Sequence, residues 1–154
     1  MRIQLLANHT ASIPVIAQWY FNEWGDLRPN NSPQLFAESL EDYLNTDKMP
    51  LMVVATEGNT TLGVAQLKYR EMDIYPEKEH WLGGVYVGDQ YRGNNIAEKI
   101  IDSILDHAGQ FGVRTLYLQT KRLDGGLYKS LGWQPVEQVN YYGLDVLVMT
   151  YQLS

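Results

Sequence analysis

The sequence predicts a mixed α/β domain, with a mostly antiparallel central sheet of about seven strands flanked by about four helices. The first supporting observation is the order of expected elements, β-α-α-β-β-β-α-β-α-β-β. The second is a single strand–helix–strand crossover over residues 80–119, which predicts one parallel pair in an otherwise antiparallel sheet. The third is composition. The 154 residues, 45% hydrophobic and 19% charged, are typical of one folded domain, here residues 1–154.

The N-terminal part of the chain is expected to form a strand and two helices. Residues 2–7 have the pattern of a short strand. The first helix begins near Ser12 and Pro14 and stops at Gly25, and the second opens at Ser32-Pro33. Apolar residues recur at helical spacing in both, at Ile13, Ile16, Ala17, Tyr20 and Trp24 and then at Leu35, Phe36, Leu40, Tyr43 and Leu44.

The middle of the chain predicts a hairpin and then a strand with unusual glycines. LMVVAT, the turn EGNT and LGVAQLKYR form the hairpin, and a polar loop over residues 71–79 follows it. In HWLGGVYVG, residues 80–88, Gly83 and Gly84 interrupt an apolar strand, which indicates a β-bulge or the close approach of a ligand. A bulge would splay this strand from its parallel neighbour. The backbone of Val85, Tyr86 and Val87 would then be free to bind an extended, amide-bearing ligand.

The longest helix is expected over about residues 93–109. Its inward face carries Ile96, Ile100, Ile101, Ile104, Leu105 and Ala108. A strand at 115–119, a short helical segment at 125–132 and two strands at roughly 134–141 and 145–152 complete the chain.

The start of the long helix, YRGNNIAEKI (residues 91–100), is unlike an ordinary helix start, which has one polar cap and an acidic first turn. Gly93 permits close approach to the backbone, Asn94 and Asn95 tolerate left-handed conformations, and Arg92 adds a permanent cation. Free N–H groups at a helix N-terminus attract phosphate. Residue chemistry alone is equally consistent with a capped helix and an exposed arginine. Combined with the free strand backbone, however, the stretch suits a pyrophosphate joined to a pantetheine arm, as in coenzyme A.

These residues resemble a known family. VYVGDQYRGNNIAEKII is similar to the acyl-CoA-binding motif of the GNAT superfamily of N-acetyltransferases, Gln/Arg-x-x-Gly-x-Gly/Ala between the fourth strand and the third helix. Asn95 stands where the motif has its first glycine, and asparagine is the commonest other residue at positive φ. YKSLGW, residues 128–133, is similar to the superfamily's Tyr-x-x-Leu-Gly-Phe segment. The six motif positions are filled by Arg92, Gly93, Asn94, Asn95, Ile96 and Ala97.

The resemblance implies an acyl-CoA N-acyltransferase fold with a V-shaped splay between strands 4 and 5, and acetyl-CoA as co-substrate. It implies direct acetyl transfer, in a ternary complex, to a primary amine of a small molecule or peptide. The absence of cysteine agrees with direct transfer. The backbone of residues 85–87 would orient the thioester, and Tyr128 would protonate the departing thiolate. His80, beside Glu79 at the start of the fourth strand, is the candidate general base.

The aromatic stretch WYFNEW, residues 19–24, lies on the first helix, near where this superfamily admits its acceptor. Its four aromatic side chains cannot share one helix face, and most are expected in the core. We hypothesise that the exposed remainder, with Glu23 and Asp26, lines an acidic and aromatic pocket for a cationic amine.

Composition excludes several classes of function. The chain has 12 Lys plus Arg and 18 Asp plus Glu, a net charge of −6, which disfavours nucleic acid and slightly favours cationic partners. Without cysteine, and with no pairing of His9 and His107, no metal site is expected. The lack of a long apolar segment predicts a soluble, unexported, cytoplasmic protein without membrane contact.

Three other functions compete with acetyl transfer. The sequence has no Gly-x-Gly-x-x-Gly turn, which argues against dinucleotide binding, and no Gly-x-Ser-x-Gly, which argues against serine-hydrolase chemistry. A non-catalytic coenzyme A sensor of the same fold stays open, although Tyr128 argues against it. The acceptor is not specified by sequence, so aminoglycosides, polyamines, amino acids and protein N-termini all remain. By analogy with the family, we also expect a homodimer that forms through the terminal strands.

Overall fold

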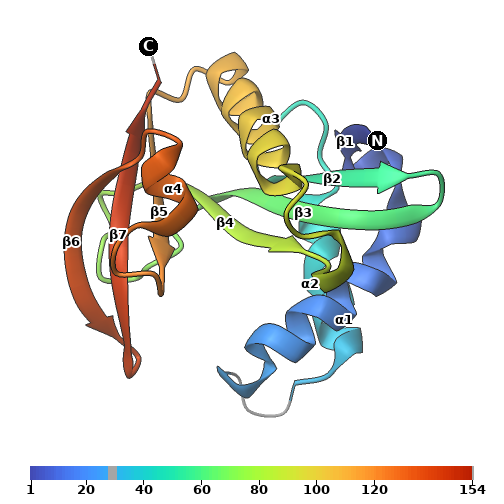
Figure 1. The fold of residues 1–154 in the computed structure, drawn as a ribbon, viewed down its shortest axis with the longest axis horizontal. Helices are drawn as coiled ribbons and strands as arrows, with labels where there is room; N and C mark the ends of the chain where they lie inside the picture. The colour runs from blue at the N-terminus through green and yellow to red at the C-terminus, as the bar shows by residue number, and fades with distance from the viewer. Residues whose placement is uncertain (28–30, 154) are drawn as a thin grey trace.

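The computed structural model describes residues 1–27 and 31–153, and its strands form one seven-stranded sheet in the order β1-β2-β3-β4-β5-β7-β6 (Figure 1). All neighbouring strands pair antiparallel except β4 and β5, which confirms the predicted mixed sheet. The strands are β1 (Arg2–Leu5), β2 (Leu51–Glu57), β3 (Thr60–Tyr69), β4 (His80–Val87), β5 (Thr115–Thr120), β6 (Gln134–Tyr141) and β7 (Leu144–Gln152).

The α-helices of the described residues are α1 (Ile13–Trp24), α2 (Pro33–Leu40), α3 (Ile96–Gln110) and α4 (Gly126–Ser130). None of these described helices has the length and apolar character needed to cross a bilayer.

Several predicted boundaries shift by a few residues. The strand expected over 2–7 ends at Leu5, because Leu6–Asn8 turns into a 3₁₀ helix. The second helix is shorter than its apolar pattern, since Glu41–Tyr43 tightens into a 3₁₀ turn. Its predicted start is correct, and the Ser32 hydroxyl caps it by accepting a hydrogen bond of 3.2 Å from the Leu35 amide.

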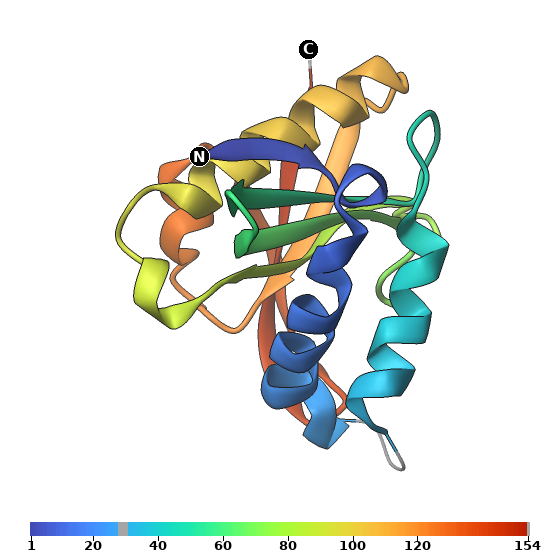
Figure 2. The same cartoon turned by 90° about the vertical axis from the view of Figure 1, so that its right-hand side faces the viewer.

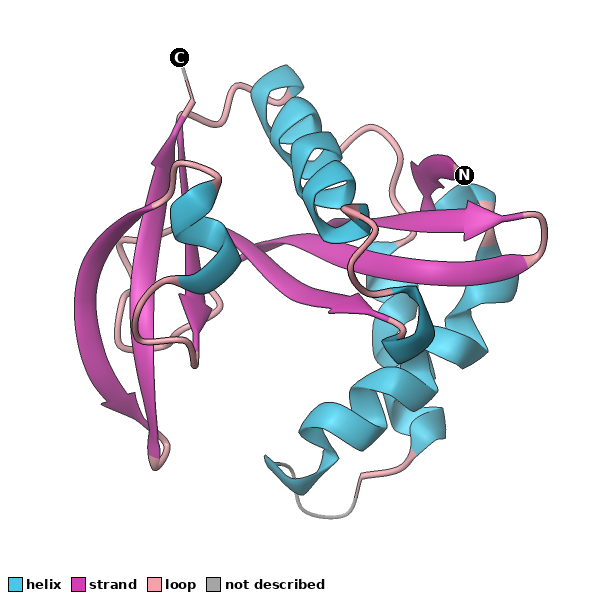
Figure 3. Ribbon diagram, viewed as in Figure 1, coloured by secondary structure: helices cyan, strands magenta, loops and turns pink. Residues whose placement is uncertain are grey.

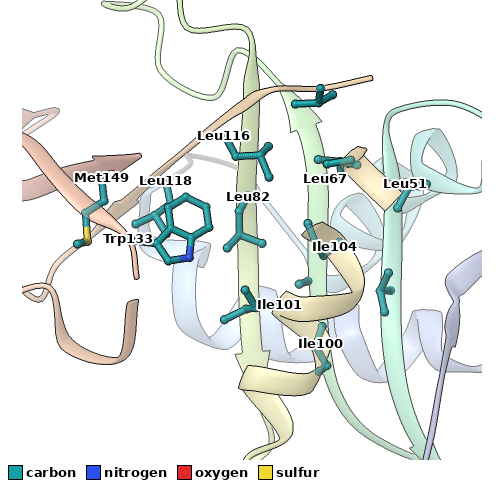
Figure 4. Close-up of a cluster of buried hydrophobic side chains, with 14 of the residues drawn as sticks. Leu51, Leu67, Leu82, Ile100, Ile101, Ile104, Leu116, Leu118, Trp133 and Met149 are labelled. Atoms are coloured by element: carbon teal, nitrogen blue, oxygen red, sulfur yellow. The ribbon is translucent and has the colours of Figure 1, made fainter. Parts of the chain in front are cut away.

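Two buried clusters cover the two faces of the sheet. Figure 2 shows α1 and α2 on one face and α3 on the other. Alternate residues of β2 enter opposite clusters, because successive side chains of a strand point to opposite faces. In the α3 cluster, Ile100, Ile101 and Ile104 pack over the leucines of the sheet (Figure 4). The apolar face predicted for the long helix is therefore its buried face.

The bulge expected in β4 is present. Gln66 of β3 pairs with Gly83 while Val64 pairs with Tyr86, so β4 contains one more residue than β3 over this interval. Gly84 takes the left-handed conformation that the bulge requires, with φ +57°. The predicted position, at the two glycines, is confirmed.

The splay between β4 and β5 follows from this bulge. In the described structure the two parallel strands pair at one position, Trp81 with Tyr117. Beyond it β4 diverges from β5 and β7, as Figure 3 shows. The segment 85–87 therefore pairs with β3 along one edge and leaves its other edge open, which confirms the V-shaped sheet.

The loop between β3 and β4, residues 70–79, is tied to the C-terminal strands. Met72 and Tyr75 are buried in a third cluster with Val146 and Val148 of β7. The Tyr75 hydroxyl donates a hydrogen bond to Glu137, and the hydroxyl of Tyr141 donates to Asp73 at 3.1 Å. This loop therefore has a fixed position between the two halves of the sheet.

Candidate active site

A cavity of about 420 Å³ lies where α1, β4, α4 and the start of α3 meet, a volume typical of small-molecule sites. Trp24 and Glu23 line it from α1 and Leu127 from α4, while the other walls come from β4 and the turn before α3. Of the nine residues predicted to bind the coenzyme, eight line this cavity: Val85, Tyr86, Val87, Arg92, Gly93, Asn95, Ile96 and Ala97. The segment 85–87 and the turn at 92–97, which are predicted from separate sequence patterns, thus line the same cavity.

The ninth predicted residue, Asn94, does not line this cavity. Its side-chain amide donates a hydrogen bond of 3.0 Å to the Tyr91 carbonyl. It lines a neighbouring cavity of about 520 Å³, with Ile96 and Lys99. Asn94 therefore shapes the turn from its other side.

The turn before α3 leaves the helix N-terminus open. The helix begins at Ile96, later than predicted, because residues 92–95 form the turn. Gly93 has φ +86°, and Asn95 has φ +60°, the left-handed conformation predicted for it. Among the described residues no side chain caps α3, and its first intrahelical bond runs from the Lys99 amide to the Asn95 carbonyl, at 3.2 Å. The preceding amides, at 96–98, belong to residues that line the cavity and have no partner within the helix.

The Arg92 side chain folds back over β4. Its Nε donates to the Val87 carbonyl at 3.1 Å, and its terminal nitrogen lies 3.0 Å from the Asp89 carboxylate. The guanidinium also lies over the Tyr86 ring, 5.4 Å from its centroid. A ligand that pairs with the Val87 carbonyl must share this acceptor with the arginine or displace it. The sequence motif gave no sign of the contact.

Tyr20 is a site residue that sequence reasoning missed. Its hydroxyl, buried beneath the bulge, donates a hydrogen bond of 2.6 Å to the Gly84 carbonyl. Burial raises the pKa of Tyr20 well above its ordinary value, and the charges of Tyr43 and Glu71 act in the same direction. Its helical position predicted burial, but the contact depends on how α1 docks on β4.

Tyr128 lies on α4, half-buried, with its ring 6.3 Å from the Trp133 ring in an edge-on arrangement. Burial raises the pKa of Tyr128 to about 12, and the negative charge of Glu71 adds to this effect. The phenol is therefore protonated at neutral pH, as a proton donor must be. Its neighbour Leu127 lines the cavity, whereas Tyr128 is not among the lining residues.

Glu71 is a second residue that no motif indicated. It begins the polar loop after β3, its side chain is 18% exposed, and its Oε1 lies 3.5 Å from the Lys68 ammonium. Its charge raises the pKa of Tyr20 on α1 and of Tyr128 on α4, the helices on the two sides of the splay. Its location depends on the loop's tertiary contacts, which have no local sequence signal.

His80 lies at the far end of β4. At about 3.3 Å per residue, it is roughly 16 Å along the strand from Val85. Its Nε2 lies 3.3 Å from the Glu79 carboxylate and its ring 5.7 Å from the Tyr69 ring. The structure therefore does not bring His80 to the cavity, and its role as a base stays a prediction.

The aromatic stretch on α1 divides between core and cavity. Tyr20 is buried, and Phe21 packs edge-on against Phe36 of α2. Trp24 lines the cavity with Glu23, and both Trp19 and Trp24 contact the Tyr86 ring. Asp26 is not among the lining residues, so one of the two predicted acidic groups reaches the cavity. Over residues 1–27 and 31–153, no group of three or more metal-ligating side chains lies together.

Comparison with known families agrees with this geometry. The profile of the acetyltransferase (GNAT) family matches residues 13–133, most of the chain, including β4, the turn, α3 and α4. The chain therefore belongs to the acetyltransferase (GNAT) family. No curated protein sequence matches it.

Solved structures of similar fold cover nearly the whole chain. An aminoglycoside 6'-acetyltransferase type Ii is 19% identical with a TM-score of 0.76, over 99% of this chain and 97% of its own. An aminoglycoside 6'-N-acetyltransferase complexed with coenzyme A is 16% identical with a TM-score of 0.77, over the same shares. A putative acetyltransferase from Salmonella typhimurium, YncA, with acetyl-CoA, is 20% identical with a TM-score of 0.72, over 100% of this chain and 94% of its own. At these identities the likeness establishes the fold.

Proposed function

We propose that the protein is an acetyl-CoA-dependent N-acetyltransferase that acetylates a primary amine of a small molecule or peptide within a ternary complex. The observation that carries the proposal is the meeting of the uncapped N-terminus of α3 and the open edge of β4 in one cavity. Membership of the acetyltransferase family supports it, as do the coenzyme A and acetyl-CoA complexes of proteins with this fold.

The cavity offers matching groups to the pyrophosphate and to the pantetheine arm of the coenzyme. The amides at 96–98 and the positive end of the α3 dipole would bind the pyrophosphate, with the Arg92 guanidinium beside it. The open backbone of 85–87 would hydrogen-bond the amides of the pantetheine arm. Asn95 supplies the turn's left-handed residue, so the departure from the family motif leaves the loop intact.

The chemistry needs a neutral amine and a proton for the leaving sulfur. The amine nitrogen attacks the thioester carbonyl carbon, a C–N bond forms, the C–S bond breaks and the nitrogen gives up a proton. We assign Tyr128 as the group that protonates the thiolate, because its phenol is protonated and lies beside the cavity-lining Leu127. His80 stays a candidate base that would act through water.

The competing function is a coenzyme-binding sensor without turnover. Tyr128→Phe separates the two, with Tyr151→Phe as the matched control because Tyr151 packs on the same Trp133. We expect Tyr128→Phe to lower thiol release in the presence of amines by about 100-fold or more while acetyl-CoA affinity is kept. A wild-type protein that binds acetyl-CoA but releases no thiol, whichever amine is supplied, would instead be a sensor.

Three further expectations, on the domain, the cellular location and the oligomeric state, belong to the same proposal. Residues 1–154 would form one catalytic domain, since the sheet runs continuously from β1 to β6. The cytoplasmic location and a homodimer through the terminal strands also stay proposals. The exposed face of the outer strand β6 is consistent with the dimer.

A further inference from the structure

The loop after β3 brings a partly buried acidic group to the apex of the V, beside the bulge of β4. The Glu71 carboxylate and the Gln66 side chain each lie beside Gly83, and the Tyr20 hydroxyl of α1 bonds to the carbonyl of the next residue, Gly84. None of these groups has a role in coenzyme binding as proposed above. The cluster thus joins the loop after β3 to Tyr20 of α1, and the charge of Glu71 also raises the pKa of Tyr128 on α4.

The Glu71 carboxylate is weakly compensated. Among the described residues it forms an ion pair with Lys68 at 3.5 Å, whereas strong charge-assisted hydrogen bonds are about 2.7–2.9 Å long. Removing a carboxylate from water is costly unless a cation or several donors accompany it. This carboxylate, 18% exposed, therefore keeps part of its surface accessible and its charge only partly compensated.

The position of this carboxylate depends on a glycine. A Cβ at Gly83 would lie 3.0 Å from Glu71 Oε1 and 3.0 Å from the Lys68 side chain. Gly83 therefore opens the space into which the carboxylate extends, one residue before the bulge. The two glycines of β4 thus have separate uses, Gly84 for the backbone turn and Gly83 for Glu71.

The loop that carries Glu71 is already fixed. Met72, the next residue, is fully buried, and Asp73 is held by the hydroxyls of Tyr141 and Tyr142. The Tyr75 hydroxyl bonds to Glu137. A charged group on an anchored loop loses little conformational freedom when it binds a ligand, so it is suited to positioning one.

We propose that Glu71 is the acceptor-binding carboxylate, which holds the ammonium end of a cationic amine at the apex of the V, beside the contact of Tyr20 with Gly84. The inference rests on the proposed acetyltransferase function and deepens it by naming the substrate class. Its chemistry is a charge-assisted hydrogen bond from the ammonium to the carboxylate.

A bound ammonium would also change the surroundings of Tyr128. Burial raises the pKa of Tyr128 in the free protein, and the negative charge of Glu71 adds to this effect. A cation on Glu71 offsets this field and makes the phenol a better proton donor. Acceptor binding and thiolate protonation would thereby be coupled, which favours cationic over neutral acceptors.

The test is a comparison of Glu71→Gln with Glu77→Gln, an exposed glutamate on the same loop. Acetyl-CoA affinity is measured by calorimetry, and thiol release is measured with spermidine, kanamycin and lysinamide and with hydroxylamine, which is largely neutral at neutral pH. For the ammonium acceptors that the wild type uses, Glu71→Gln should raise KM by about tenfold or more, with a smaller change in kcat. Acetyl-CoA affinity, hydroxylamine turnover and Glu77→Gln should be unchanged.

Lys68→Met should change KM in the direction opposite to Glu71→Gln. This result would exclude a purely structural role of Glu71. If Glu71 only held the loop through Lys68, both substitutions would lower the thermal midpoint and activity together. If Glu71 binds the acceptor, Lys68→Met removes a competing cation and lowers KM. An unchanged KM in Glu71→Gln, equal losses in the two glutamate variants, or a wild type that uses only hydroxylamine would overturn the proposal. Failure of the wild type to bind acetyl-CoA would instead overturn the proposed function.

Discussion

The hydroxyl of Tyr20 on α1 donates a 2.6 Å hydrogen bond to the carbonyl of Gly84, the residue at which β4 bulges. This contact couples the first helix to the strand that diverges from β5. It satisfies a carbonyl that the bulge removes from ordinary strand pairing. The shape of the cavity therefore depends on a residue 64 positions away in the chain.

Removal of this hydroxyl should weaken the bulge. In Tyr20→Phe the Gly84 carbonyl loses its donor, which should lower the free energy of unfolding by about 1–3 kcal/mol. Urea denaturation measures the change. Tyr69→Phe, at an exposed tyrosine, is the control and should be close to neutral. Equal effects in the two variants would contradict the role of Tyr20.

Gly84 should be intolerant of any side chain for two reasons that a matched pair can separate. Gly84 and Gly58 both have positive φ, +57° and +58°, so alanine at either should cost about 1–2 kcal/mol of backbone strain. At Gly84 the new Cβ would also lie 2.5 Å from the Tyr20 oxygen, whereas at Gly58 it meets nothing within 4 Å. Gly84→Ala should therefore unfold at clearly lower urea concentration than Gly58→Ala. A smaller loss of stability in Gly84→Ala than in Gly58→Ala would mean that the bulge relaxes freely around the new side chain.

Asn95 should be replaceable by glycine but not by alanine. Its φ of +60° is tolerated by asparagine and glycine, while alanine should cost about 1 kcal/mol there. Because the same residue shapes the open end of α3, Asn95→Ala should also weaken acetyl-CoA binding, whereas Asn95→Gly should retain it. Thermal melting and calorimetry of both variants test this. Equal affinities for the two would show that the turn does not form the coenzyme site.

Asp89 should compete with a bound anion for Arg92. The two side chains lie 3.0 Å apart and both are exposed, so the ion pair is weak and sensitive to salt. Asp89→Asn should strengthen acetyl-CoA binding by about two- to fivefold at low ionic strength and less at high salt. Asp102→Asn removes the same charge from an exposed position on α3 and is the control. Weaker binding in Asp89→Asn would mean that Asp89 positions Arg92 for the ligand.

The raised pKa of Tyr128 predicts a loss of stability in alkali. Its value of about 12 in the folded protein exceeds the value of about 10 for an unfolded tyrosine. Over this interval the folded protein retains the proton that the unfolded chain releases. The contribution of Tyr128 to the free energy of unfolding is therefore fully present below about pH 10 and is lost as the pH rises to about 12. Tyr128→Phe should show a shallower fall in urea denaturation across this range, and identical slopes would contradict the assignment.

The architecture was largely predictable because its signals are local. The apolar spacing of α3, the hairpin turn before β3 and the glycine pair in β4 each depend on neighbours in sequence. The place of β7 between β5 and β6 was not predicted, because strand order is decided by packing between distant segments. The end of α2 was missed since helical spacing continues through the 3₁₀ turn that follows it.

The cavity was more predictable on the coenzyme side than on the acceptor side. The turn at 92–97 and the segment 85–87 are contiguous, so a motif reports them. Tyr20 and Glu71 reach the bulge from elements that no motif links to β4. The family resemblance makes His80 a candidate base, but it stands five residues before Val85 on an extended strand, and so it lies far from the cavity.

Calorimetric titration of the wild-type protein with acetyl-CoA, beside an Arg92→Ala, Asn95→Asp double variant, tests the central claim most directly. The substitutions remove the cation and place an anion at the open end of α3. Micromolar binding by the wild type that is lost in the double variant is the predicted result. Absence of binding by the wild type, or equal binding by both proteins, would contradict a coenzyme site at the start of α3.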